Sequence, residues 1–264
     1  MHKIFIVLLS FIILGVFVLP FIYPLSPYTL NPQSILLAPS YEHIMGTDRL
    51  GRDIFARILE GGQTSLFIGF LSAMITSFIG LIIGVSAGYF RGNVDKSITI
   101  LIDLFLTFPT FFLLLALVSY MEASILVLII VLFSTGWMGM ARMIRSESFA
   151  IASKPYIKIL SLADVKKSKI ILKYFTPLLA PIFLISFTFG VGGAILAESG
   201  LSFLGLGINP PQISWGSILS EGKEVLEIAW WVSFFPGLFI FIVTFCLIQI
   251  ADYLQFKLNA KDMH

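Results

Sequence analysis

The chain has 264 residues, of which 58% are hydrophobic and 12% charged, and its formal net charge is +2. Soluble domains average about 45–50% apolar and about 25% charged residues, so this composition excludes a soluble globular protein and indicates a protein of the lipid bilayer. The single cysteine, Cys246, lies in an apolar run, which excludes a disulfide framework or a cysteine-based metal site within the chain.

Six apolar runs are long enough to cross a membrane, because about 20 residues rising about 1.5 Å each span a hydrocarbon core of about 30 Å. Five contain no Asp, Glu, Lys or Arg, and the third contains only Asp103. The predicted spans are 4–22, 66–90, 97–121, 123–141, 174–197 and 228–251. We therefore expect an all-α membrane protein in which residues 1–264 form a single six-span domain.

The first run, 4–22, follows Lys3 and has the outline of a secretory signal peptide. Residues 18–22 read VLPFI and offer none of the small side chains that a cleavage site requires. We therefore expect this run to be kept as an N-terminal anchor helix.

Residues 43–53, before the second span, read HIMGTDRLGRD and combine turn-forming glycines with alternating charges. The pattern over 50–59 predicts a helix that Thr47 or Asp48 would cap. Within the second span, Gly80, Gly84 and Gly88 recur at every fourth position. Their bare backbone lies on one helix face, which predicts close packing of another helix against it.

Two acidic residues lie in or beside the spans. Asp103 is about 9 Å along the third span from its cytosolic start, at about 1.5 Å per residue. Glu198 directly follows the fifth span. Each is either a structural hydrogen-bonding group or part of a substrate pathway, and for Asp103 the structural role is favoured.

The loop 142–173 holds eight Lys or Arg and two acids in 32 residues. After a break at Pro155 it offers an apolar patch at Ile159, Leu160 and 162–163, followed by lysines along one helix face. A loop of this length suits docking to a soluble partner. The alternative is an amphipathic segment lying on acidic lipid headgroups.

The distribution of Lys and Arg predicts the orientation, because basic residues concentrate in cytosolic segments. With the N-terminus inside, 13 of the 17 are cytosolic and four are external, namely Arg49, Arg52, Arg57 and Lys223. We therefore expect both termini in the cytosol and two sizeable outer segments, 23–65 and 198–227.

No enzyme chemistry is evident in the sequence. Gly222 and Lys223 are followed by Glu224 and do not form a phosphate-binding loop. The three histidines are too scattered for a metal site on one helix face. We therefore expect no catalytic residue, cofactor or metal in this chain.

Three motifs carry a family resemblance: GTDRLGRD at 46–53, LSFLGLGINPP at 201–211 and SWG at 214–216. From about His43 to Asp252 the chain closely resembles inner-membrane permeases of binding-protein-dependent ABC importers, in the dipeptide, oligopeptide and nickel class. The resemblance implies the type I importer permease architecture, with a core at about 66–252. It also implies a second, related permease, two ATPase subunits that bind ATP and Mg²⁺, an extracytoplasmic substrate-binding protein and no nucleic acid.

These permeases share a cytosolic segment of two short helices that sits in a groove of the ATPase, and here it corresponds to 156–177. The chain departs from the family pattern in having 158–160 in place of Glu-Ala-Ala and Asp164 in place of the turn glycine. The coupling residues that the resemblance implies are Tyr156, Ile159, Leu160, Ala163, Asp164, Ile170 and Pro177.

The alternative function is a channel or an ATP-independent carrier. Such a carrier would need ion-coupling carboxylates near the middle of the membrane or a pair of broken-helix repeats. Asp103, the one charged residue within the predicted spans, lies off-centre, which favours the importer.

Overall fold

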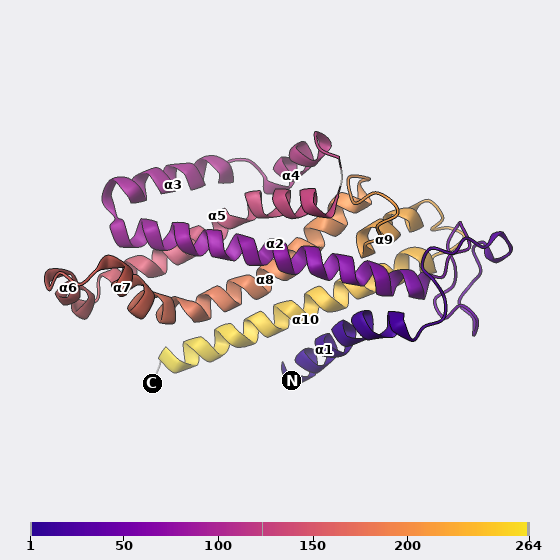
Figure 1. Ribbon diagram of the computed structural model, residues 1–264, viewed down its shortest axis with the longest axis horizontal. Coiled ribbons are helices and arrows are strands. Elements are labelled where there is room, and N and C mark those ends of the chain that lie inside the picture. The colour runs from indigo at the N-terminus through magenta and orange to yellow at the C-terminus, as the bar shows by residue number, and fades with distance from the viewer. Residues whose placement is uncertain (1, 123, 263–264) are drawn as a thin grey trace.

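The computed structural model describes residues 2–122 and 124–262, which form a bundle of helices along one long axis (Figure 1). Besides short helical turns, the described residues contain one isolated antiparallel bridge, between Thr47 and Asp53. The α-helices are α1 (His2–Val18), α2 (Ile54–Phe90), α3 (Gly92–Leu106), α4 (Thr110–Ser119), α5 (Ile125–Ala152), α6 (Pro155–Leu162), α7 (Lys167–Ile170), α8 (Thr176–Phe203), α9 (Trp215–Lys223) and α10 (Trp231–Asp262). The predicted all-α class is confirmed.

The described chain has five helices that are long and apolar enough to cross a membrane, formed by α1, α2, α5, α8 and α10 with their adjoining turns. The pair α3 and α4 makes a sixth span only if it is counted as one, because the two helices are bent by 77°. The prediction of one continuous helix over 97–121 is therefore wrong. Pro109, the N-cap residue of α4, has no N–H to donate and disfavours helical geometry at Phe108.

Several helices extend beyond the predicted spans. α2 has 37 residues and begins at Ile54, whereas the apolar run begins at 66. α5 continues to Ala152, so the first part of the predicted loop 142–173 belongs to this helix. Hydropathy marks where lipid ends, whereas a helix continues through charged residues that reach the aqueous interface. The predicted start of the fourth span, residue 123, lies outside the described residues.

The core lies around α2, which packs along α5 and α8, while α10 packs along α8 (Figure 1). Two buried indoles tie α9 and α10 to the start of α2 and to the segment that precedes it. The Trp215 Nε1–H donates to the Ile58 carbonyl at 2.9 Å, and the Trp231 Nε1–H donates to the Thr47 carbonyl at 3.1 Å. Each indole combines a large apolar surface with a satisfied donor, which fixes this end of the bundle.

The two ends of the bundle carry different functional segments. α6 and α7 lie at one end, and α9 lies at the opposite end with the segment that precedes α2 (Figure 1). The basic loop and the motif-bearing segments are therefore separated along the long axis, which is the arrangement that a transmembrane orientation requires.

Candidate functional site

The segment 156–177 leaves α5 at a sharp break and returns into α8. Pro155 stands at the first position of α6, where its fixed φ suits a helix start. Asp164, after α6, has φ of 54°, the left-handed geometry for which the family pattern uses glycine. A π-helical turn, Ile171–Phe175, then joins α7 to α8. The turn after α6 is therefore made with Asp164 in a left-handed conformation.

One face of this segment is anchored in the bundle. Ile157 and Ile170 are buried, and they pack in one apolar cluster with Phe175, Ile144 and Leu179. The Tyr156 and Tyr174 rings lie 6.3 Å apart. Burial of several large side chains contributes about 1.5–3 kcal/mol each, so α6 and α7 are held against α5 and α8 as a firm unit.

The other face carries exposed apolar side chains. Ile159 is 63% exposed and Leu162 is 87% exposed, whereas Leu160 packs partly against the buried cluster. Exposed apolar groups on an anchored helix suit contact with a protein partner or with lipid. The residues implied by the resemblance therefore divide into exposed Tyr156, Ile159, Ala163, Asp164 and Pro177, half-buried Leu160 and buried Ile170.

The C-terminal end of α2 is tied to the end of α5 by Arg91 and to this segment by Phe90. The Arg91 Nη2–H donates to the Ser153 Oγ at 2.8 Å and to the Phe149 carbonyl at 3.2 Å, at the end of α5. The Lys167 ammonium, on α7, lies 5.5 Å from the centroid of the Phe90 ring. These contacts join α2 to α5 and to α7 at this end of the bundle. Sequence reasoning did not identify Arg91 as part of the site.

The glycine stripe of α2 faces α5. A Cβ on Gly80 would lie 2.7 Å from Met140 Cγ, and one on Gly84 would lie 2.7 Å from the Ala141 carbonyl oxygen. At Gly88 a Cβ would overlap Ser148. Side chains at these positions would push α5 away, so the stripe permits the close approach of the two helices.

We expect Gly84→Leu to lower the amount of folded, assembled protein, because the added side chain must displace α5 at a cost of at least about 1–3 kcal/mol. Ser86→Leu is the control, because Ser86 lies on another face of α2 and is only half-buried. Yields of monodisperse protein in detergent measure the difference. Equal yields would mean that the contact between α2 and α5 does not require glycine.

Asp103 pairs with Arg142, which links α3 to α5, and both side chains are more than half exposed. A second pair, Asp95 with Arg145, joins the same helices, with Asp95 Oδ2 accepting from the Arg145 Nη2–H at 2.9 Å. Exposed pairs contribute at most about 1 kcal/mol. In the structure Asp103 therefore forms an ion pair that links two helices, which is a structural contact.

A buried ionic cluster lies at the opposite end, where α2 begins. The Arg57 Nη2–H donates to Glu221 Oε1 at 2.9 Å, and its other terminal nitrogen contacts Asp48 and Glu221. Arg52 donates to Asp48 at 2.6 Å and to Glu221 at 2.7 Å. Burial raises the pKa of Asp48, but the interactions with Arg57 and Arg52 lower it by more. The pKa of Asp48 therefore lies below its usual value. Two cations and two carboxylates thus bind the start of α2 to α9.

Neither Thr47 nor Asp48 caps this helix, so that prediction is wrong. The N-cap is Asp53, whose Oδ1 accepts from the Ala56 N–H at 2.8 Å. Asp48 is used in the ionic cluster, and the Thr47 hydroxyl donates to the Ser34 carbonyl. Burial and the Asp53 carboxylate raise the pKa of Tyr23, which donates to Asp53, to about 12. The helix predicted over 50–59 accordingly begins at Ile54.

Glu198 is fully buried near the end of α8 among serine hydroxyls. Its Oε1 accepts from Ser202 and from Ser214 at 2.7 Å each, and its Oε2 accepts from Ser65 at 3.3 Å. The Ser214 Oγ also accepts from the Ser217 N–H and so caps α9. One carboxylate therefore joins α2, α8 and α9. The sequence identified Glu198 but gave no sign of the partner hydroxyls.

The described residues contain no group of three or more His, Cys, Asp or Glu side chains that could hold a metal ion.

Comparison with known proteins gives the family. Residues 80–260 match the family model described as "Binding-protein-dependent transport system inner membrane component". The chain is 33% identical to the oligopeptide transport system permease protein OppC of Haemophilus influenzae over 97% of this chain and 83% of that protein.

A second relative is the dipeptide transport system permease protein DppC of Bacillus subtilis, at 37% identity over 95% of this chain and 80% of that protein. Among solved structures, an inward-facing conformation of the MetNI methionine ABC transporter has a TM-score of 0.60 and 16% identity, over 76% of this chain and 97% of that one. This likeness confirms the predicted importer permease fold. The chain therefore belongs to the binding-protein-dependent inner-membrane components of ABC importers, as a multi-pass permease subunit.

Proposed function

We propose that this chain forms half of the translocation pathway of an ATP-driven peptide importer and couples to cytosolic ATPases through the segment 156–177. As a member of its family it is the non-catalytic membrane component, and partner ATPases hydrolyse the ATP. The relatives reported above are named for oligopeptide and dipeptide transport and match nearly the whole chain. Neither is named for nickel, so the proposal is restricted to peptides.

The observation that carries the coupling role is the two-faced build of the segment. Ile157 and Ile170 anchor it in the bundle, while Ile159 and Leu162 project from its surface. Movement of a partner bound to the exposed face would be passed to α5 and α8 through the buried face. ATP binding that favours one arrangement of the ATPases would then shift the permease between inward-open and outward-open states.

The assembly that we propose contains a second homologous permease, two ATPases and an extracytoplasmic binding protein. In this assembly residues 1–264 act as a single permease domain, with the run 4–22 as an anchor beside the importer core at 66–252. The close contact of the stripe Gly80, Gly84 and Gly88 with α5 would hold this core together. Asp103 and Glu198 serve as structural polar groups, in keeping with their partners Arg142 and the serine hydroxyls.

Uptake measurements test the substrate class. Cells without other peptide importers, supplied with this chain and its partner subunits, should accumulate labelled dipeptides or oligopeptides in an ATP-dependent manner. Nickel uptake by the same cells should not change. Nickel accumulation without peptide accumulation would contradict the proposal.

The orientation proposed from the basic residues places both termini and the segment 156–177 in the cytosol. On a Cys246→Ser background, single cysteines at Asn93 and Ser161 should be shielded from a membrane-impermeant thiol reagent in intact cells. Cysteines at Gln212 and Lys223 should react, and all four positions are exposed in the structure. The reverse pattern would overturn the orientation and remove the segment from the ATPases.

A further inference from the structure

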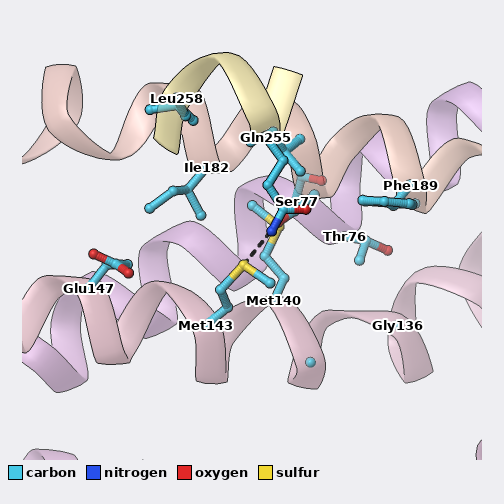
Figure 2. A pocket seen from close by; sticks show the side chains of 14 residues that line it. Thr76, Ser77, Gly136, Met140, Met143, Glu147, Ile182, Phe189, Gln255 and Leu258 are labelled. Atoms are coloured by element: carbon cyan, nitrogen blue, oxygen red, sulfur yellow. Dashed lines mark hydrogen bonds between the residues drawn. The ribbon is translucent and has the colours of Figure 1, made fainter. Parts of the chain in front are cut away.

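Two adjoining cavities lie between the core helices. Figure 2 shows side chains of α2, α5, α8 and α10 around the first, whose volume is about 460 Å³. The second, of about 240 Å³, is lined by α2, α4, α5 and α8. Thr76, Gly136 and Gly190 line both, so the two cavities meet around these residues. We refer to the pair as the core groove.

The core groove is elongated along the bundle. Its lining extends over sixteen positions of α8, from Ile182 to Ala197, and over sixteen of α5, from Leu132 to Glu147. At about 1.5 Å per residue this length is about 22 Å, against about 30 Å for a hydrocarbon core. The groove is therefore long enough to form a path across most of the membrane. It is longer than a pocket that would hold a single side chain.

Two lining glycines face open space. Nothing lies within 4 Å of an ideal Cβ at Gly139 or at Gly193, in contrast to Gly84, whose Cβ would meet Ala141 and Ile144. Gly139 and Gly193 are therefore not used for packing among the described residues. They leave backbone bare at the surface of the cavity.

The lining is mostly apolar, but it carries polar groups on each of the helices α2, α5, α8 and α10. Ser72 is buried, lines the second cavity, and its Oγ has no hydrogen-bond partner among the described residues. Gln255 and Glu147 line the first cavity, with Gln255 beside Ser77 and Glu147 toward the end of α5 that leads to α6 (Figure 2). A packed helix would bury these groups at considerable cost, whereas polar residues within membrane helices commonly face a water-filled pathway.

The charge of the groove is low and of one sign. Among the described residues that line it, Glu147 alone carries a charge. Hydroxyl groups can donate to peptide carbonyls and accept from peptide N–H groups, and the flexible thioethers of Met140 and Met143 adapt to different side chains. A single carboxylate at one end disfavours anions and favours cations.

We propose that the core groove is the translocation surface of this subunit, and that it takes neutral or cationic peptides by contacts with their backbone. This assignment rests on the proposed importer function. It identifies Gly139 and Gly193 as the positions past which the peptide slides, and Ser72 as a hydrogen-bonding group along the path.

Filling the groove tests the assignment. Gly139→Leu and Gly193→Leu should each lower peptide uptake at least tenfold, while ATPase association and protein yield stay at the parental level because the added Cβ meets open space. Gly15→Leu, a half-buried glycine of α1 outside the groove, is the control and should transport normally. Normal uptake by both groove variants would overturn the assignment. Loss of peptide uptake by the parent protein would instead overturn the proposed function.

Water access gives a readout that does not depend on the substrate. On a Cys246→Ser background in the assembled complex, Gly139→Cys and Gly193→Cys should react with a cationic methanethiosulfonate reagent. Leu184→Cys, on an exposed position of α8 outside the groove, should react at least tenfold more slowly. Reaction of both groove cysteines as slowly as Leu184→Cys would show that a helix of the second permease covers the groove, and the proposal would fail.

Discussion

Replacing Arg57 with Met should strongly destabilise the end of the bundle that contains α9. The Arg57 side chain is 1% exposed and forms ion pairs with both Asp48 and Glu221, which lie in separate parts of the chain. Without it, the buried Asp48 carboxylate keeps Arg52 as its one charged partner among the described residues. Breaking a buried ionic network in this way costs about 3–5 kcal/mol. Thermal unfolding of the purified complex measures the loss.

The matched control is Arg49→Met, in the same motif. Arg49 pairs with Glu224, and both side chains are about half exposed, at 46% and 56%. Exposed pairs contribute about 0–1 kcal/mol, so this variant should unfold close to the parental temperature. Equal losses in the two variants would mean that the buried cluster does not hold α2 to α9.

Placing Asp at both Ile159 and Leu162 should abolish ATPase association while leaving the permease folded in the membrane. Both side chains are exposed in the isolated subunit, so the change leaves its own core intact. In the assembly we expect both to be buried in the ATPase, where an unpaired carboxylate costs several kcal/mol. A loss of about 3 kcal/mol weakens association more than 100-fold. Co-purification of the ATPases and ATP-dependent uptake measure the effect.

Leu204→Asp combined with Leu226→Asp is the control for this experiment. These leucines are 52% and 53% exposed and lie near the ends of α8 and α9, far from α6 (Figure 1). The control should retain its ATPases. If the variant at Ile159 and Leu162 also retains them and transports normally, the segment 156–177 is a lipid-facing loop.

The sequence predicts the apolar helices well, because about 20 uncharged residues have few alternatives in lipid. It fails at the helix ends. α2 and α5 extend beyond their apolar runs, where hydropathy carries no information about helix length. The break at Pro109 is different, because the proline itself was visible within the predicted run 97–121 and its effect on the preceding residue is local.

The polar contacts were less predictable. Arg57 and Glu221 are 164 residues apart, and only the folded bundle brings them together. The same holds for Glu198, whose partners Ser65 and Ser214 come from α2 and from the residue before α9. Single positions that need an unusual backbone were easier: Asp164 stands where the family pattern has glycine, and its φ is positive.

Site-specific cross-linking at Leu162 tests the central claim most directly. A photoreactive phenylalanine derivative at this position, 87% exposed on the outer face of α6, should form an adduct with the ATPase subunit in the assembled complex. The same group at Leu204, at the opposite end of the bundle, should not. Adducts of Leu162 with lipid alone, in a complex that still contains its ATPases, would contradict coupling through the segment 156–177.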